Sequence, residues 1–341
     1  MKPSLLRASA AAILWLAGLG AASAMDGVVA SIRPVASLVA GVMDGAGAPD
    51  LIVEAGASPH TYSLKPSGAR ALQKAKLIFW IGPDLEAFLD KPIDSLGEGA
   101  TVVTLSKADG VELLPARRGG AFEKHQHDHA GEEHDAHEHA HEMETGEHEH
   151  EHDHEADAAE HADHHDDEGT DWHVWLDPMN ARAFVAAIAE ALSKADPANA
   201  ALYARNAAAV SARIDALAAD VTADLAPVRG KPFIVFHDAY QYFEHRFGVA
   251  AAGSITVSPE NIPGAARVQE IRSKIAESGA VCVFSEPQFE PRLVRVVTEG
   301  TNARTGVLDP LGSDIADGPD LYFSLIRDMA KALKSCLAEA S

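Results

Sequence analysis

The segment 121–169 contains almost none of the side chains from which a folded core is built. It holds 14 of the 18 histidines of the chain and 19 of its 51 aspartates and glutamates, with Lys124 as its one cation. After Phe122, its only large apolar side chain is Met143. Because so little apolar surface cannot offset the entropy lost on ordering, we expect this segment to be disordered. The folded core must therefore be formed by the rest of the chain.

The composition of this histidine-rich tract is typical of metal binding. Its 19 acidic residues and one lysine give it a net charge of −18, and the whole chain carries −23. Imidazole and carboxylate groups at this density are ligands for borderline divalent metals. A solvated acidic linker is the alternative, but such linkers are usually built from Glu, Asp, Ser and Pro. The acidic balance also argues against a nucleic-acid partner, which requires basic patches.

Residues 1–24 have the pattern of a cleavable secretory signal. Lys2 and Arg7 supply the positive end, an apolar run follows, and Ala22-Ser23-Ala24 fits the small-x-small cleavage pattern. The apolar run is too short to span a bilayer, which needs about 20 residues. No cysteine follows it, which argues against a lipoprotein anchor. We expect cleavage after Ala24 and a soluble exported protein.

The remaining sequence alternates apolar strands with amphipathic helices in both halves. This pattern predicts parallel sheets that are covered by helices on both faces. The predicted strands cover 28–32, 51–53, 77–81 and 101–105, and then 233–236, 253–257, 281–285 and 305–308. The predicted helices cover 35–43, 67–75, 85–89, 239–247, 265–278, 291–299 and 321–337. The fold class is therefore α/β, and no P-loop or GxGxxG motif indicates a nucleotide.

A long helix is predicted between the two halves, at 196–227. Asp196 can cap it, Pro197 suits its first turn and Pro227 ends it. At 1.5 Å per residue such a helix would span about 45 Å. An ordinary helix within one domain is the alternative, but this length favours a strut that joins two lobes. The first lobe would then comprise 25–195, including the tract, and the second 228–341.

Four histidines lie outside the tract, and three of them occur where apolar segments meet polar turns. His60 comes soon after the strand at 51–53, His237 directly follows the strand at 233–236, and His173 lies within the segment 171–178. The carboxyl ends of strands in open α/β sheets are where ligands bind. Because neutral imidazole is a standard zinc ligand, we expect these three side chains to form a zinc site. His245 lies within a predicted helix and is interpreted as structural.

Asp309 is the candidate for a fourth ligand, because it follows the predicted strand at 305–308. Three histidines and this aspartate would give a tetrahedral N₃O site with two ligands from each lobe. His173 and His237 should donate their second ring N–H to acceptors, which fixes each tautomer. Asp171 and Asp238 are close to these two histidines in sequence.

The mature chain has two cysteines, Cys282 and Cys336. In an oxidising compartment such a pair is more often bridged than free. Closing the long loop between them would contribute roughly 4 kcal/mol of stability. The alternative is two buried thiols, because Cys282 lies within a predicted strand.

Several segments of the chain resemble one known family. They read GASPHTYSLKPS at 56–67, DWHVWLDP at 171–178 and FHDAYQYF at 236–243, with SEPQF at 285–289 and VLDPLG at 307–312. The family is the periplasmic zinc-binding protein of the high-affinity zinc ABC transporter. The resemblance covers the whole mature chain, and the combination of these segments with a histidine-rich insertion is highly specific.

The resemblance implies two (β/α)₄-like lobes joined by one long rigid helix, with the metal in the cleft between them. By motif position, the three histidine ligands of the family fall on His60, His173 and His237. Manganese-type relatives carry Glu at the position of His237, so this residue favours zinc. The wider family uses an aspartate at the position of Asp309. Some zinc members have Glu where this chain has Pro59, so the fourth ligand is either Asp309 or water.

The resemblance also implies a disulfide between Cys282 and Cys336. It implies a periplasmic protein, expected to be a monomer, that captures Zn²⁺ and delivers it to an ABC-transporter permease. An exported zinc hydrolase is one alternative, but the chain has no HExxH motif and no Glu beside a candidate ligand. A manganese or iron carrier of the same fold is another, although nitrogen-rich sites favour zinc. The third is a metal buffer that acts through the tract alone.

Overall fold

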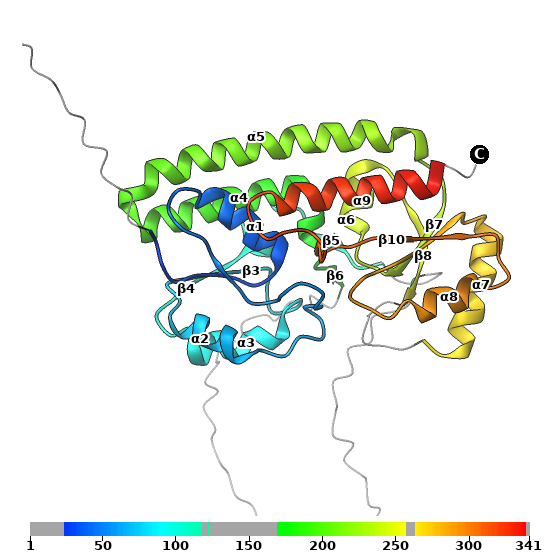
Figure 1. The fold of residues 1–341 in the computed structure, drawn as a ribbon, viewed down its shortest axis with the longest axis horizontal. Coiled ribbons are helices and arrows are strands. Elements are labelled where there is room, and N and C mark those ends of the chain that lie inside the picture. The colour runs from blue at the N-terminus through cyan, green and yellow to red at the C-terminus, as the bar shows by residue number, and fades with distance from the viewer. Residues whose placement is uncertain (1–23, 118–121, 123–168, 257–262, 339–341) are drawn as a thin grey trace, which may run out of the picture.

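The computed structural model describes residues 24–117, 122, 169–256 and 263–338 (Figure 1). The predicted signal peptide, except for Ala24, lies outside these residues. So does the histidine-rich tract, except for Phe122 and Gly169. In the described part of the chain, no helix is both long and apolar enough to cross a membrane.

The first half of the chain forms a four-stranded parallel sheet in the order β2-β1-β3-β4. Its strands are β1 (Val28–Ala30), β2 (Asp50–Leu51), β3 (Leu77–Trp80) and β4 (Thr101–Thr104). Its helices are α1 (Arg33–Val42), α2 (Pro66–Gln73) and α3 (Ala87–Leu96). The helix predicted at 85–89 is therefore longer and includes Pro92. Leu89 and Ile93 on either side of this proline are buried, so core packing offsets the loss of one helical donor.

A buried carboxylate lies where β3 ends. The Glu86 side chain accepts hydrogen bonds from the backbone N–H of Ile81 at 2.8 Å and of Gly82 at 3.1 Å. Burial raises the pKa of this carboxyl from 4.5 to about 7, and outweighs the hydrogen bonds to the carboxylate, which lower it. The first lobe therefore contains an acid that titrates near neutral pH.

The second half repeats the arrangement, with a four-stranded parallel sheet in the order β10-β9-β7-β8. Its strands are β7 (Phe233–His237), β8 (Ala251–Thr256), β9 (Cys282–Ser285) and β10 (Arg304–Val307). Its helices are α6 (Gln241–Phe247), α7 (Ala265–Ser278), α8 (Arg292–Thr298) and α9 (Leu321–Ala338). The predicted α/β class with two parallel sheets is confirmed. Cys282 in β9 and Cys336 in α9 form a disulfide with their Cα atoms 6.2 Å apart.

The segment between the sheets contains two helices, α4 (Pro178–Ala195) and α5 (Ala200–Leu225). The sequence prediction missed α4, although the Asp177 side chain accepts a hydrogen bond from Met179 N at its start. The long helix expected at 196–227 begins and ends with short 3₁₀ turns, at Pro197–Asn199 and Ala226–Val228. Its α-helical part is 26 residues long, or about 39 Å at 1.5 Å per residue. Figure 1 shows α5 running along both halves of the molecule.

One apolar core extends across both halves. It joins β1 and β3 of the first sheet to β7 and β9 of the second through α4, α5 and α9. Helix α9 comes from the second half of the chain but packs against α1 and α5. A smaller cluster lies between β8, α7, β9 and α8. The two sheets are thus held by a common interior as well as by the connecting helix.

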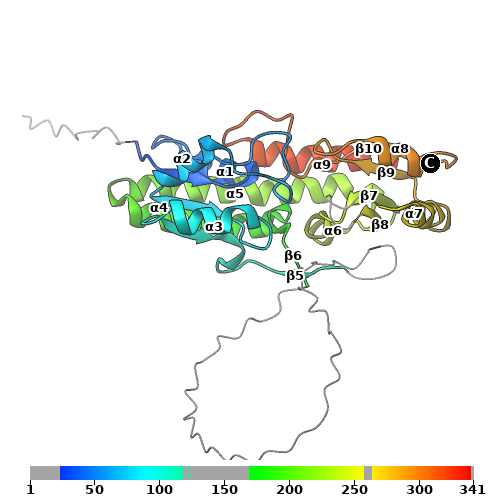
Figure 2. The same cartoon turned by 90° about the horizontal axis from the view of Figure 1, so that it is seen from below.

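A short antiparallel hairpin flanks the histidine-rich tract. Strand β5 (Leu114–Pro115) pairs with β6 (Thr170–Asp171), with Leu114 opposite Asp171. Figure 2 shows β5 and β6 side by side, between the two halves. The backbone N–H of Ala116 donates to the carbonyl of Gly169 and extends this pairing. The hairpin could not be predicted from the sequence, because two-residue strands show no periodicity.

Candidate metal centre

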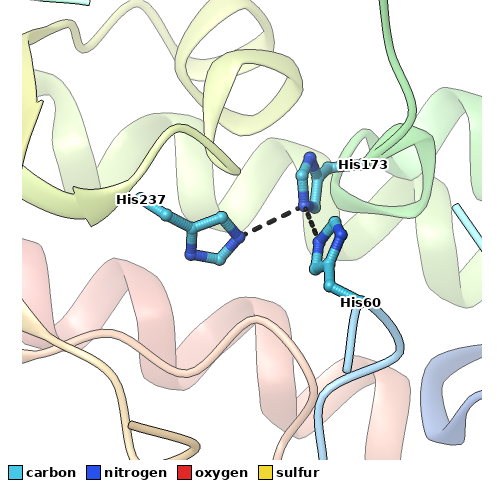
Figure 3. Close-up of side chains that lie close together, drawn as sticks. All are labelled: His60, His173 and His237. Carbon is cyan, nitrogen blue, oxygen red and sulfur yellow. Dashed lines mark hydrogen bonds between the residues drawn. The ribbon is translucent and has the colours of Figure 1, made fainter. Parts of the chain in front are cut away.

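The structure brings His60, His173 and His237 together (Figure 3). The Nε2 atom of His173 lies 3.2 Å from Nε2 of His60 and 3.3 Å from Nε2 of His237. With zinc–nitrogen bonds of 2.0–2.1 Å, two ligand nitrogens on a tetrahedral ion are about 3.3 Å apart. The two distances from His173 therefore match tetrahedral coordination, and all three ligand atoms lie within 4.8 Å of one another.

Each histidine comes from a different part of the chain. His60 lies on the loop between β2 and α2, where its backbone N–H donates to Ser58 Oγ at 3.3 Å. His173 lies between β6 and a 3₁₀ turn at Val174–Leu176. His237 is the last residue of β7, at the carboxyl end of the second sheet. Two ligands thus come from the first lobe and one from the second.

Two of the three imidazole rings contact a carboxylate at Nδ1, the ring nitrogen that faces away from the other histidines. Nδ1 of His173 is 2.8 Å from Asp171 Oδ1, and Nδ1 of His237 is 2.7 Å from Glu286 Oε1. An N–H at Nδ1 that points to a carboxylate leaves the Nε2 lone pair directed at the centre of the group. Asp171 therefore acts as one of the acceptors expected from the sequence. Glu286 was missed, because it lies 49 residues from His237 and no local pattern joins the two.

The electrostatic environment of His237 is acidic. Burial lowers the pKa of this imidazole, but the charge and hydrogen bond of Glu286 raise it more. The charges of Asp238 and Asp171 act in the same direction, and the pKa lies above its ordinary value. The same negative charge that favours a proton on this ring favours a divalent cation beside it.

The carboxylates of Asp309 and Asp238 bind groups other than the three imidazoles. The Asp309 carboxylate accepts hydrogen bonds from the backbone N–H of Leu311 at 3.0 Å, from Ser313 N, and from Gln288 Nε2 at 2.7 Å. It does not belong to the group formed by the three histidines. Asp238 pairs with Arg117 and does not accept from His237 Nδ1.

The remaining histidine outside the tract, His245, is exposed on α6 and is not part of the group. The centre in the described residues thus offers three nitrogen ligands, and its fourth position is not filled by Asp309 in this conformation. Three buried or half-buried imidazoles favour borderline metals over hard ones.

Comparison with known proteins agrees with this geometry. Residues 28–336 match the family model described as zinc-uptake complex component A, periplasmic. The chain is 55% identical to the high-affinity zinc uptake system protein ZnuA of Brucella suis, over 94% of this chain and 95% of that protein.

Two solved structures share the fold at low identity. A crystal structure of ZnuA matches with a TM-score of 0.69 and 20% identity, covering 92% of this chain and 100% of the other. The solute-binding protein FpvC of Pseudomonas aeruginosa in complex with Mn²⁺ matches with a TM-score of 0.70 and 19% identity, covering 92% and 99%. From its family match and its identity to the Brucella protein, this chain belongs to the family of periplasmic zinc-uptake component A proteins.

Proposed function

We propose that this protein captures Zn²⁺ in the periplasm with His60, His173 and His237 and delivers it to the permease of an ABC transporter. The observation that supports this most directly is the spacing of the three Nε2 atoms, at 3.2 and 3.3 Å from the central His173. The ion is cargo, so the chemistry is ligand exchange: three imidazoles replace part of its hydration shell. The family to which the chain belongs supports the same role.

Zinc is favoured over manganese by the donor set. The fold alone does not choose the metal, because FpvC shares it and holds Mn²⁺. Three nitrogen donors suit zinc, whereas Mn²⁺ prefers oxygen ligands. The one nearby carboxylate proposed as a ligand, Asp309, is engaged by Leu311, Ser313 and Gln288. We therefore propose a three-histidine site whose fourth ligand is water.

A binding role is also favoured over hydrolysis. The carboxylates nearest the site, Asp171 and Glu286, each accept from an imidazole at 2.8 and 2.7 Å. A general base would have to be free to take a proton from a metal-bound water. We further propose that residues 1–24 direct export and are removed, that the tract at 121–169 adds weaker zinc sites, and that the protein acts as a monomer.

The test is zinc titration in competition with a chelator. Three proteins are compared: the mature full-length chain, a variant lacking 123–168, and that variant with His60, His173 and His237 replaced by alanine. The deletion keeps Gly169, whose carbonyl pairs with Ala116 N. We expect the deletion to lose weak sites and keep one tight zinc, and the triple substitution to lose the tight zinc as well.

A matched control is His245→Ala in the deletion variant, because this exposed histidine lies outside the group. It should retain the tight zinc. If the deletion variant binds no tight zinc, or if the triple alanine variant still does, the assignment of the site is wrong.

A further inference from the structure

A half-buried arginine, Arg117, joins the hairpin beside the tract to the segment that follows His237. Arg117 Nε donates to Asp238 Oδ2 at 3.1 Å, and its Nη2 donates to Oδ1 of the same carboxylate. Nη1 and Nη2 also donate to the two carboxylate oxygens of Glu244, at 2.7 and 3.0 Å. The side chains of Asp238 and Glu244 are only 3% and 5% exposed. One guanidinium thus bridges two buried carboxylates of the second lobe.

Further contacts hold α6 to the same hairpin. The Tyr242 hydroxyl donates to the carbonyl of Asp171 at 2.7 Å and accepts from the backbone N–H of Leu114 at 2.9 Å. Gln241 Nε2 donates to the carbonyl of Pro115 at 3.0 Å. Helix α6 is therefore attached to both strands of the hairpin, although it follows them by more than sixty residues.

Both ends of this connection are next to metal ligands. Asp238 directly follows His237, and Asp171 in β6 accepts from Nδ1 of His173. The Nε2 atoms of His237 and His173 are 3.3 Å apart. A shift of Asp238 relative to the hairpin would change this distance. Nothing in the three-histidine chemistry itself requires Arg117, which touches none of the three rings.

We propose that Arg117 is a positioning residue of the metal centre: its fork, bound to Asp238 and Glu244, fixes the distance between His237 and His173. This inference rests on the proposed zinc-binding function. The guanidinium is suited to the task because it is planar and presents donors to two carboxylates at once, whereas a lysine ammonium is a single point charge. Glu244 also accepts from Ala251 N at 2.9 Å, so the bridge reaches the start of β8.

The critical variant is Arg117→Lys, which keeps the positive charge beside the two carboxylates and removes the fork. The expected result is a zinc affinity about tenfold lower, the lower end of the range for groups that orient metal ligands. The spectroscopic measurement is Co²⁺ substitution, because the intensity and position of its visible bands report the coordination geometry. We expect the bands of Arg117→Lys to differ from those of the wild-type protein.

The matched control is Arg246→Lys. Arg246 lies on α6, the helix that carries Glu244, and donates to both carboxylate oxygens of the buried Asp177 at 2.7 Å. Asp177, unlike Asp238, is not next to His237 in the sequence. This control should bind zinc within about threefold of wild type, less than the tenfold or greater losses expected of groups that orient ligands, and leave the Co²⁺ bands unchanged. Thermal unfolding of the metal-free proteins measures how much each change destabilises the fold.

Two results would overturn the proposal. One is an Arg117→Lys protein with wild-type zinc affinity and wild-type Co²⁺ bands. The other is an equal loss in both lysine variants, which would assign the effect to general docking of α6. If Arg117→Lys does not fold, Asp238→Asn tests the same bridge from its other side, with the same spectral change expected. A wild-type protein without tight zinc would overturn the proposed function itself, and this inference with it.

Discussion

Replacing Glu86 by glutamine should change how the stability of the protein depends on pH. Burial raises the pKa of this carboxyl from 4.5 to about 7, so the folded state keeps a proton that the unfolded chain has already released. The stability due to this proton is fully present below about pH 4.5 and is lost as the pH rises through about 7. At 1.36 kcal/mol per pH unit, the loss is about 3 kcal/mol.

Glu86→Gln cannot titrate, but its side-chain oxygen can still accept from the N–H groups of Ile81 and Gly82. The free energy of unfolding of this variant should therefore lack the decline of about 3 kcal/mol that wild type shows between pH 4.5 and 8. Urea denaturation at several pH values, with a chelator present to remove zinc, measures the difference. Glu98→Gln, at an exposed position, is the matched control and should follow wild type within about 0.5 kcal/mol.

The comparison depends on the difference between two proteins, so titration of the other groups cancels. Wild-type and Glu86→Gln profiles that stay parallel from pH 4.5 to 8 would show that Glu86 takes up no proton on folding. If wild type instead loses stability relative to Glu86→Gln as the pH falls, the sign of the pKa change is wrong.

Three further predictions concern the metal centre and the disulfide. His237→Glu should lower the ratio of zinc to manganese affinity, because a hard oxygen replaces a borderline nitrogen; competition titrations with both metals check this, and an unchanged ratio would count against His237 as a ligand. Glu286→Gln should weaken zinc binding by about tenfold to a hundredfold, and wild-type affinity would show that its contact with His237 Nδ1 has no role in the site. Removing the Cys282–Cys336 disulfide by double serine substitution should lower the free energy of unfolding by roughly 4 kcal/mol; denaturation curves of the two proteins would contradict this if they coincide.

The strands and most helices could be predicted from the sequence because their apolar patterns report burial directly. The strand at 77–81 reads as continuous apolar sequence, and β3 is buried at all four positions. Helix α4 was missed, although the Asp177-Pro178 start signal and the helical spacing of its buried residues Phe184, Ile188 and Leu192 were present in the sequence. The hairpin of β5 and β6 depends on contacts across the tract, which no local pattern contains.

At the metal centre, the sequence indicated the ligands better than their surroundings. His60, His173 and His237 were identified because they lie where apolar strands or loops meet polar turns. Their hydrogen-bond partners depend on which loops the fold brings together. Asp171 is two residues from His173 and could be suggested, whereas Glu286 directly follows the neighbouring strand β9. Asp309 follows a strand as expected, but its carboxylate binds the N–H groups of its own turn.

The apolar core shared by the two sheets limits how zinc can be exchanged. Moving the sheets apart as two rigid bodies would expose apolar surface, at about 2.5 kcal/mol per 100 Å². The loop between β2 and α2, which carries His60, is a much smaller unit: Ala57 and Tyr62 on it are only partly buried against the core, whereas Ser58 and Pro59 are buried. We therefore expect zinc to be exchanged by local opening of this loop, with the rest of the molecule as a fixed frame.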